Sequence, residues 1–470
     1  MSAQPFYKNV ARLLFLNVLI KPLWIFGVDR QVQNVVGPHA YGTYFALFNL
    51  SLVFSFITDA GLSTMMNRQV ASGTPLNMGH LLRLKAALAA VYSVLVLAAA
   101  WLSGVDDWLI LISVISIQVL LSFFNFLRGS ITAHQLFAWD VWLSVLDKVL
   151  MLFFFLPLLY TQLFQIPITI HFFLEAQLFC TAIATSAALV IVLKKTVLHI
   201  EVRQKTTAIL KQVAPYAGII LLMATHNRLD GFLLERLHRN GAYEAGVYAA
   251  AYRLLDVANM MGYLVASFLV PFLARHRTDA FLVQQTTAAA RFVLLLAGGF
   301  ITLFVVAFAG PLQHLLYPLA SAYTAQVLQL CLPVLPAYLL LHVYSSLLTA
   351  FAQLKLFVIL LFFAVVINVI LNMLLIPKWG AVGCCIAALA SQYVCAISVY
   401  FFAVRRNGLQ HGGKQVVVLV VLLLFLSLLF WVAVRYGFHP LLAFVVGGLA
   451  LLLALFAYLP FFKRSVRLSG

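Results

Sequence analysis

The chain has 470 residues, of which 64% are hydrophobic and 9% carry a charge, against roughly 45–50% and about 25% in soluble domains. No soluble fold can bury so large an apolar fraction, so a water-soluble enzyme is excluded. The apolar runs do not alternate with polar residues as the strands of outer-membrane barrels do, and residues 416–431 are apolar almost without interruption. The composition predicts an all-α polytopic membrane protein.

The net charge is +17, from 30 Lys and Arg against 13 Asp and Glu. Such a balance also suits a nucleic-acid binder, but the basic residues lie in short loops between apolar segments and not on one face or in one tail. Loops of this kind stay on the cytoplasmic side of a membrane. The five Cys fall inside apolar runs without a pairing pattern or a metal-ligand spacing. We therefore expect no nucleic-acid partner, no metal and no cofactor.

Windows of about twenty residues place fourteen transmembrane helices along the chain. They cover residues 10–28, 41–66, 80–103, 107–131, 141–161, 168–193, 213–235, 244–273, 287–310, 323–351, 355–376, 380–403, 414–434 and 440–462. With the N-terminus inside, 21 of the 30 Lys and Arg fall on the cytoplasmic side, five fall outside and four fall within spans. A missed helix would invert every later loop, so this bias supports both the number of spans and two cytoplasmic termini.

The longest hydrophilic interruption covers residues 194–211 and contains five cations and a single Glu. A second basic break covers residues 405–414. Six spans precede the first break, six lie between the two breaks and two follow. The sequence therefore predicts one six-helix lobe over residues 1–200, a second over 201–404 and two further helices over 405–470.

The pattern Gly-x4-Gly-x-Tyr occurs at residues 37–44 and again at 241–248, offset by 204 residues. Each copy enters the second helix of its six-helix half. An ordinary Gly turn before a helix is the alternative interpretation, but the shared topological place favours an internal duplication. Transporters are often built from such repeats around a site near the midplane of the membrane.

Further short motifs follow in order along most of the chain. The positions are Gly37-Pro-His-Ala-Tyr-Gly42-Thr-Tyr44, Asp59-Ala-Gly61-Leu, Pro215, Asp230, Gly246-Val-Tyr248, Ala251-Tyr-Arg253, Pro271, Ala350-Phe-Ala-Gln-Leu-Lys355, Asn368, Asn372 and Pro377-Lys-Trp-Gly380-Ala-Val-Gly383. Together they resemble the polysaccharide flippases of the multidrug/oligosaccharidyl-lipid/polysaccharide exporter superfamily, which includes O-antigen and teichuronic acid exporters.

This resemblance implies two six-helix lobes in a V about a central cavity that is exposed alternately to the two sides of the membrane. It implies a monomeric flippase of the bacterial inner membrane that translocates a lipid-linked oligosaccharide for cell-surface polysaccharide, such as the O-antigen of lipopolysaccharide. An ion-coupled multidrug exporter and a lipid II flippase are the alternatives. The two extra helices favour a flippase, because multidrug extruders usually stop at twelve. No enzymatic activity is expected, since an intramembrane glycosyltransferase would need long outer loops.

Once charges near the span ends are assigned to the loops, nine ionisable residues remain within the membrane, and the cost of charge in lipid constrains where they lie. They are Lys21, Asp59, Asp147, Lys148, Glu175, Arg228, Asp230, Arg253 and Asp256. A charged side chain that faces lipid costs about 3 kcal/mol. Nine of them would together cost more than the roughly 5–15 kcal/mol by which folded proteins are stable. We therefore expect these side chains to face protein or a wet cavity.

Helical spacing predicts which of these charges are partners. Arg228 and Asp230 are about 200° apart around a helix, and the neighbours Asp147 and Lys148 are about 100° apart. The sequence therefore predicts that none of these four pairs with its neighbour in the chain and that each has a partner on another helix.

A polyprenyl pyrophosphate head, the cargo that the resemblance implies, needs cationic partners. The candidates are Arg228, Lys21 and Arg253. Each has an alternative: Arg253 can pair with Asp256 three residues on, Arg228 can join the same network, and Lys21 can extend toward the membrane interface. The candidates for binding H⁺ or Na⁺, or for a structural charge network, are Asp59, Glu175, Asp230, Asp256, Asp147 and Lys148.

Overall fold

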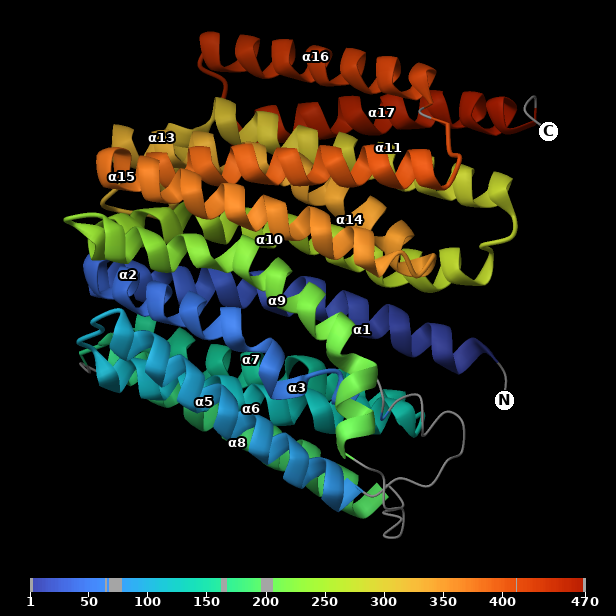
Figure 1. The fold of residues 1–470 in the computed structure, drawn as a ribbon. Helices are drawn as coiled ribbons and strands as arrows, with labels where there is room; N and C mark the ends of the chain where they lie inside the picture. The colour runs from blue at the N-terminus through green and yellow to red at the C-terminus, as the bar shows by residue number, and fades with distance from the viewer. Residues whose placement is uncertain are drawn as a thin grey trace. The chain divides into compact units, whose positions relative to one another are not determined.

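The structure is a computed structural model that describes residues 3–63, 66, 78–161, 167–195, 206–410 and 412–467. Throughout these ranges the chain forms helices joined by short turns, and no strand occurs in them (Figure 1). Contacts divide the chain into two compact units, residues 1–246 and 247–470. Each unit is described by itself.

The first unit contains the helices up to the start of α10. Their bounds are α1 Ala3–Trp24, the π-helix η1 Ile25–Asp29, α2 Arg30–Phe54, α3 Phe56–Asp59, α5 Met78–Leu102, α6 Trp108–Ala133, α7 Phe137–Tyr160, α8 Ile170–Lys195, α9 Thr206–Leu237 and α10 Gly241–Arg275. Within it α1 packs on α7, α2 packs on α9, and α6 packs on α8.

The second unit contains the rest of α10 and all later helices. They are α11 Ala280–Ala307, α12 Ala309–Leu316, α13 Ala322–Cys331, the 3₁₀ helix η2 Leu332–Val334, α14 Leu335–Ala350, α15 Leu354–Arg406, α16 Gly413–Arg435 and α17 Pro440–Arg467. α14 packs on α11 and α15, and α16 packs on α11.

The predicted fold class is confirmed, because in the described ranges each predicted span coincides largely with helix. Nine helices in the described ranges are long and apolar enough to cross a membrane. α15 is one of them and accounts for two predicted spans, since at 53 residues it far exceeds the roughly 20 that a bilayer requires. Its backbone turns at Gly380, whose φ of 54° suits a residue without a side chain. The other predicted spans coincide with α1, α2, α9 and α17.

Proline and glycine shape the first two spans. Pro22 lacks an amide hydrogen, and the helix continues after it as the π-turn η1. The helix then runs to Gly37, whose φ of 82° reverses the chain before Pro38. The predicted break between the first and second spans therefore lies at Gly37.

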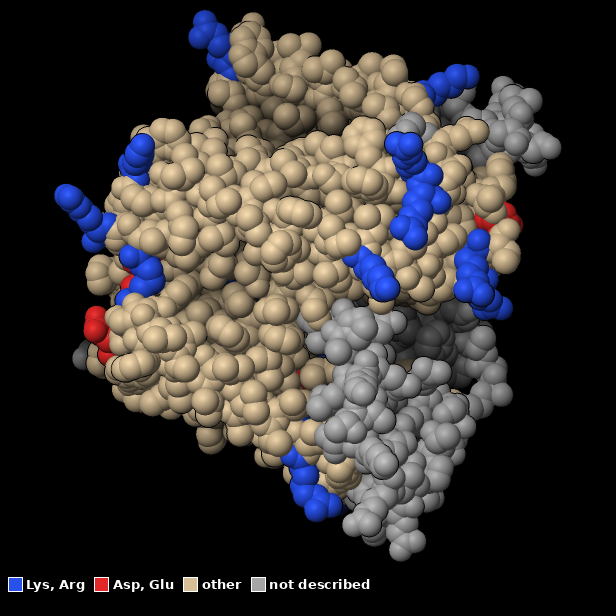
Figure 2. All heavy atoms as spheres, in the orientation of Figure 1, with Lys and Arg blue, Asp and Glu red and all other residues tan. Residues whose placement is uncertain are grey.

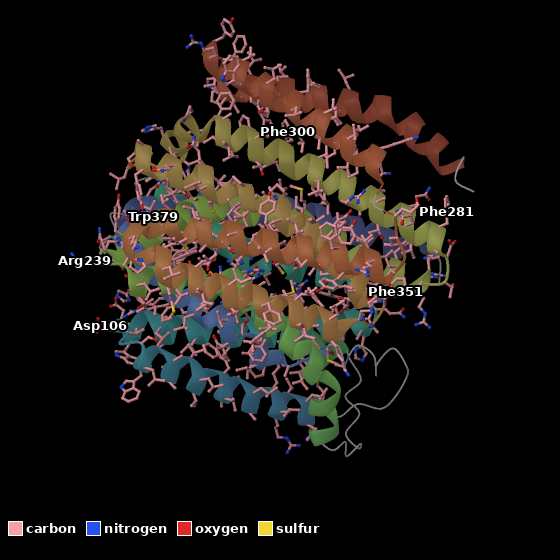
Figure 3. The ribbon with its side chains drawn as sticks, turned by 45° about the horizontal axis from the view of Figure 1, so that its top comes forward. Asp106, Arg239, Phe281, Phe300, Phe351 and Trp379 are labelled. Atoms are coloured by element: carbon pink, nitrogen blue, oxygen red, sulfur yellow. The ribbon has the colours of Figure 1, made fainter. Side chains whose placement is uncertain are left out.

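The chain reverses direction at the ends of the helices that the predicted order of spans requires. In the first unit, Asp106 and Arg239 lie at the same end of the helices, whereas in the second unit Trp379 lies at the end opposite Phe281 and Phe351 (Figure 3). Lys and Arg side chains on the visible face of the second unit lie near helix ends, with an uncharged band between them (Figure 2). This is the distribution expected of helices that cross an apolar layer.

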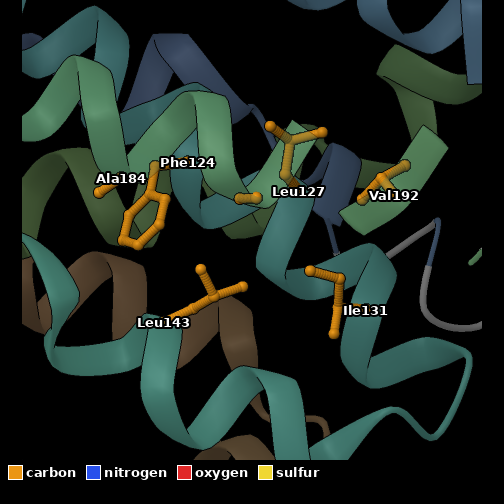
Figure 4. Close-up of a cluster of buried hydrophobic side chains, with 7 residues drawn as sticks. Phe124, Leu127, Ile131, Leu143, Ala184 and Val192 are labelled. Carbon is orange, nitrogen blue, oxygen red and sulfur yellow. The ribbon is translucent and has the colours of Figure 1, made fainter. Parts of the chain in front are cut away.

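Apolar packing holds the helices of the first unit together. One buried cluster joins α6, α7 and α8 (Figure 4). It consists of Phe124, Leu127, Ile131, Leu143, Ala184, Ala188 and Val192. The small Ala side chains at 184 and 188 let α8 approach α6 closely.

The two copies of the repeated glycine pattern contact one another within the first unit. A Cβ atom on Gly42 would lie 2.6 Å from the amide nitrogen of Gly246 and would clash with the carbonyl of Ala242. A Cβ atom on Gly246 would clash with the carbonyl of Pro38. The Gln33 amide also donates to the Gly246 carbonyl at 2.8 Å. Both glycines are therefore required because two backbones touch.

We expect Gly246→Ala to destabilise the protein by about 1–3 kcal/mol, because the obstructing atoms belong to backbone and cannot rotate away. The measurement is thermal unfolding of the purified protein in detergent. Gly218→Ala in α9 is the matched control, since no atom lies within 4 Å of the added methyl group. Equal melting temperatures for the two variants would contradict the close contact.

Candidate functional site

Five charged side chains from α1, α6 and α7 gather in the first unit, and we call them the α1–α7 charge cluster: Lys21, Arg128, Asp140, Asp147 and Lys148. Arg128 Nε lies 2.7 Å from Asp140 Oδ1. Lys148 Nζ lies 3.1 Å from Asp147 Oδ2. Lys21 is close enough to Arg128, Asp147 and Lys148 to interact with them electrostatically. Three of the predicted site residues are therefore neighbours in the structure: Lys21, Asp147 and Lys148.

Contacts between α1 and α7 position this cluster. The Asn17 amide of α1 donates to the Ser144 hydroxyl of α7 at 2.9 Å. The Lys148 ammonium lies 4.3 Å from the centre of the Trp24 ring, which is a favourable cation–π distance. Each contact joins one side chain of α1 to one of α7, so the register between the two helices is fixed on both sides of Lys21.

The charges of the cluster do not cancel. Its two carboxylates are each engaged by one cation, Asp140 by Arg128 and Asp147 by Lys148. The third cation, Lys21, makes no hydrogen bond or ion pair with any side chain that the structure describes, and it is half-buried. An ammonium so placed is incompletely solvated and lies among other cations, and an anion would relieve both conditions. Lys21 is therefore the cation of this cluster that has no carboxylate partner among the described residues.

One sequence prediction about this cluster is wrong. Asp147 and Lys148 were expected to need separate partners because they point about 100° apart, yet they pair with each other. The angle describes only where the Cβ atoms point. The four-carbon stem of Lys148 is long enough to bring its ammonium back to the neighbouring carboxylate. The Trp24 ring then holds the ammonium in that position.

The sequence analysis missed a second charged site in the first unit, at Lys85. Its side chain is completely buried, and its ammonium lies 3.4 Å from Oδ1 of Asp59. The sequence analysis counted Lys85 among the 21 cytoplasmic Lys and Arg, because it lies close to the start of the predicted span 80–103. The available signals were its place inside that span and its apolar neighbours Leu84 and Ala86. Asp59 was predicted, and the structure shows its partner.

Asp29 and Arg291 also escaped prediction, as did the buried carboxylates Asp140 and Glu244. Asp29 ends the π-turn of the first span, is wholly buried and accepts a hydrogen bond from the Tyr41 hydroxyl at 2.9 Å. Arg291 of α11 is buried and donates to the Tyr344 hydroxyl at 3.3 Å and to the Gln415 side chain at 3.4 Å. Both lie near predicted span ends, where sequence alone does not separate a loop charge from a buried one.

The remaining predicted site residues are distributed over both units. Asp230 of α9 is buried and Arg228 is half-buried in the first unit. In the second unit Arg253 of α10 is buried and Asp256 is half-buried. Glu175 of α8 is exposed and has no hydrogen bond or ion pair with a described residue, so the structure does not bring it to the other predicted charges.

Surface grooves lie beside helices in the described part of the chain, and two of them are lined by residues of known placement. A groove of about 340 Å³ between α1 and α7 contains Arg12, Phe15 and Trp142. A groove of about 420 Å³ between α16 and α17 is lined by apolar side chains, among them Phe425 and Phe438. In the parts of the chain that are described, no group of three or more His, Cys, Asp or Glu side chains could hold a metal ion.

Comparison with known proteins defines the fold. No protein-family model matches the sequence, and no curated protein matches it. The solved structure of lipid II flippase MurJ in an inward closed conformation is 14% identical, with a TM-score of 0.66 over 94% of this chain and 97% of that one. An inward-facing multidrug resistance MATE family transporter of the MOP superfamily is 15% identical, with a TM-score of 0.65 over 85% and 98%.

A third match has the same fold. A MOP superfamily transporter from Pyrococcus furiosus is 15% identical, with a TM-score of 0.61 over 85% of this chain and 96% of that one. At these identities the likeness concerns the fold. The chain therefore has the polytopic helical fold shared by MATE transporters and MurJ.

We expect Asp140→Ala to destabilise the protein by about 2 kcal/mol, because it leaves the Arg128 guanidinium without its carboxylate in a mostly buried position. Thermal or denaturant unfolding in detergent measures the change. Replacing both partners, as Arg128→Met with Asp140→Leu, should restore part of the loss since no charge is then left unpaired. Glu175→Ala is the control and should cause no loss. A double variant less stable than Asp140→Ala would contradict the pairing argument.

Proposed function

We propose that the chain is a flippase of the bacterial inner membrane that translocates a lipid-linked oligosaccharide by alternating access. The observation that carries this proposal is Lys21, the cation of the α1–α7 charge cluster that has no carboxylate of its own. A pyrophosphate between the polyprenyl chain and the sugar would supply the missing negative charge. We assign Arg228 and Arg253 to the same head group, because a dianionic pyrophosphate requires more than one cation.

The fold supports translocation and not a chemical reaction. MATE transporters and MurJ, the proteins that share it, are by description transporters and a flippase. The match to MurJ covers 94% of this chain, whereas the MATE match covers 85%, roughly the share that residues 1–404 represent. The final two helices therefore favour the flippase over the multidrug exporter. We propose that residues 1–200 and 201–404 are the two moving lobes and that both termini are cytoplasmic.

Ion coupling is assigned to carboxylates in the two proposed lobes. Asp59 and Asp147 are bound to lysines, and we assign them, with Lys148, to the structural charge network. Asp230 and Asp256 remain the candidates for binding H⁺ or Na⁺, since both are at least half-buried on α9 and α10. The role of exposed Glu175 stays a prediction.

We expect Lys21→Ala to slow translocation of a fluorescent polyprenyl pyrophosphate sugar roughly tenfold, the effect of losing one charge-assisted contact of about 1.5 kcal/mol. The protein is reconstituted into liposomes, and protection of the fluorophore from an external quencher measures translocation. Lys21→Arg should retain most of the rate because the charge remains.

Arg12→Ala is the matched control, since Arg12 is an exposed cation on the same helix. An unchanged rate in Lys21→Ala would remove that residue from the mechanism. Export of cationic dyes with no transport of the lipid-linked sugar would identify a multidrug exporter instead. Faster transport of lipid II than of the oligosaccharide carrier would identify a lipid II flippase.

A further inference from the structure

The ammonium of Lys85 lies in an enclosed set of oxygen atoms in the first unit. Its Nζ donates to the Ser122 hydroxyl at 2.7 Å, to the Thr58 carbonyl at 3.0 Å and to the Asp59 carboxylate at 3.4 Å. An ammonium has three N–H donors, so these three acceptors satisfy it completely. These oxygen atoms therefore satisfy the charge and all three N–H donors of the buried ammonium. Lys85 has no N–H donor left for a further ligand.

The three acceptors form a recognisable ligand set. A backbone carbonyl, a hydroxyl and a carboxylate are oxygen ligands of the kind that hard cations bind in proteins. They come from two parts of the chain, the end of α3 and the middle of α6. The Ser122 hydroxyl also lies 3.3 Å from the Thr58 carbonyl, so the ligands are close to each other as well as to the ammonium.

Aromatic rings complete the surroundings of the ammonium. The centres of the Phe126 and Phe123 rings lie 5.2 and 5.7 Å from Nζ, within the range of cation–π attraction. The Asp59 side chain is 37% exposed, so water and small ions reach one edge of the site. The Ser63 hydroxyl donates to the same Asp59 oxygen at 2.5 Å and fixes the carboxylate there.

We propose that Lys85 is a built-in monovalent cation: its ammonium fills a site whose oxygen ligands would bind an alkali or ammonium ion if the lysine were absent. The cation is tethered through α5, so it joins α5 to α3 and α6 without being taken up from solution. The first unit is thus independent of Na⁺ and K⁺ at this position. This inference concerns a cation site and does not rest on the proposed cargo.

The test is to remove the tethered cation and supply a free one. Lys85→Ala opens space for an ion and leaves the three oxygen ligands in place. We measure its melting temperature in detergent in choline chloride and, at equal ionic strength, in chlorides of ammonium, methylammonium, Na⁺ and K⁺. At about ten times its dissociation constant, the ion that binds should raise the melting temperature by about 3 °C relative to choline, beyond any rise in the wild-type protein.

Two further variants make the result specific. Arg83→Ala removes an exposed cation from the same helix and should respond to salts as the wild-type protein does. Lys85→Ala combined with Ser122→Ala lacks one ligand and should lose the added response. If Lys85→Ala folds only when ammonium or an alkali ion is present, the proposal is supported.

Three results would overturn the inference. The first is a response of Lys85→Ala to these salts equal to that of the wild-type protein. The second is a response that survives loss of the Ser122 hydroxyl. The third is failure of Lys85→Ala to fold in all of the salts.

Discussion

The cost of charge in apolar surroundings is the constraint on which this structure depends. Lys85 and Asp29 are wholly buried and Asp140 is nearly so, and each is held by a named partner. A charge facing lipid costs about 3 kcal/mol, a large part of the total stability of a folded protein. The polar contacts therefore do more than satisfy the charge and hydrogen-bonding groups of single residues. They fix which helices are neighbours, because the partners of these three charges lie on other elements.

Backbone contact is the second constraint, and it gives the repeated glycines a physical explanation. Gly42 and Gly246 occupy corresponding places in the two copies of the pattern, and a side chain at either would meet backbone atoms of the other copy. The spacing was visible in the sequence as similarity between two segments. The structure adds that the two segments touch. A duplication whose copies pack on each other keeps both glycines for the same reason, since a change in either one separates the helices.

The sequence predicted the helices well and the charged sites only in part. Spans were predictable because an apolar layer requires about twenty apolar residues, a property that each segment carries by itself. Lys21, Asp59, Asp147 and Lys148 were found because they stand well inside such segments. Lys85, Asp29 and Arg291 stand close to the ends, where depth depends on how helices tilt and pack. The pairing of Asp147 with Lys148 was missed because it depends on side-chain length and on Trp24, which is distant in sequence.

The fold alone does not choose the cargo, because a multidrug transporter and a lipid II flippase share it. The sign of the available charge is more selective. Asp59, Asp140 and Asp147 are each held by a cation, while Lys21 has no ion pair among the residues described. The third cation of the α1–α7 charge cluster therefore suits the anionic head group that we propose better than it suits a cationic drug.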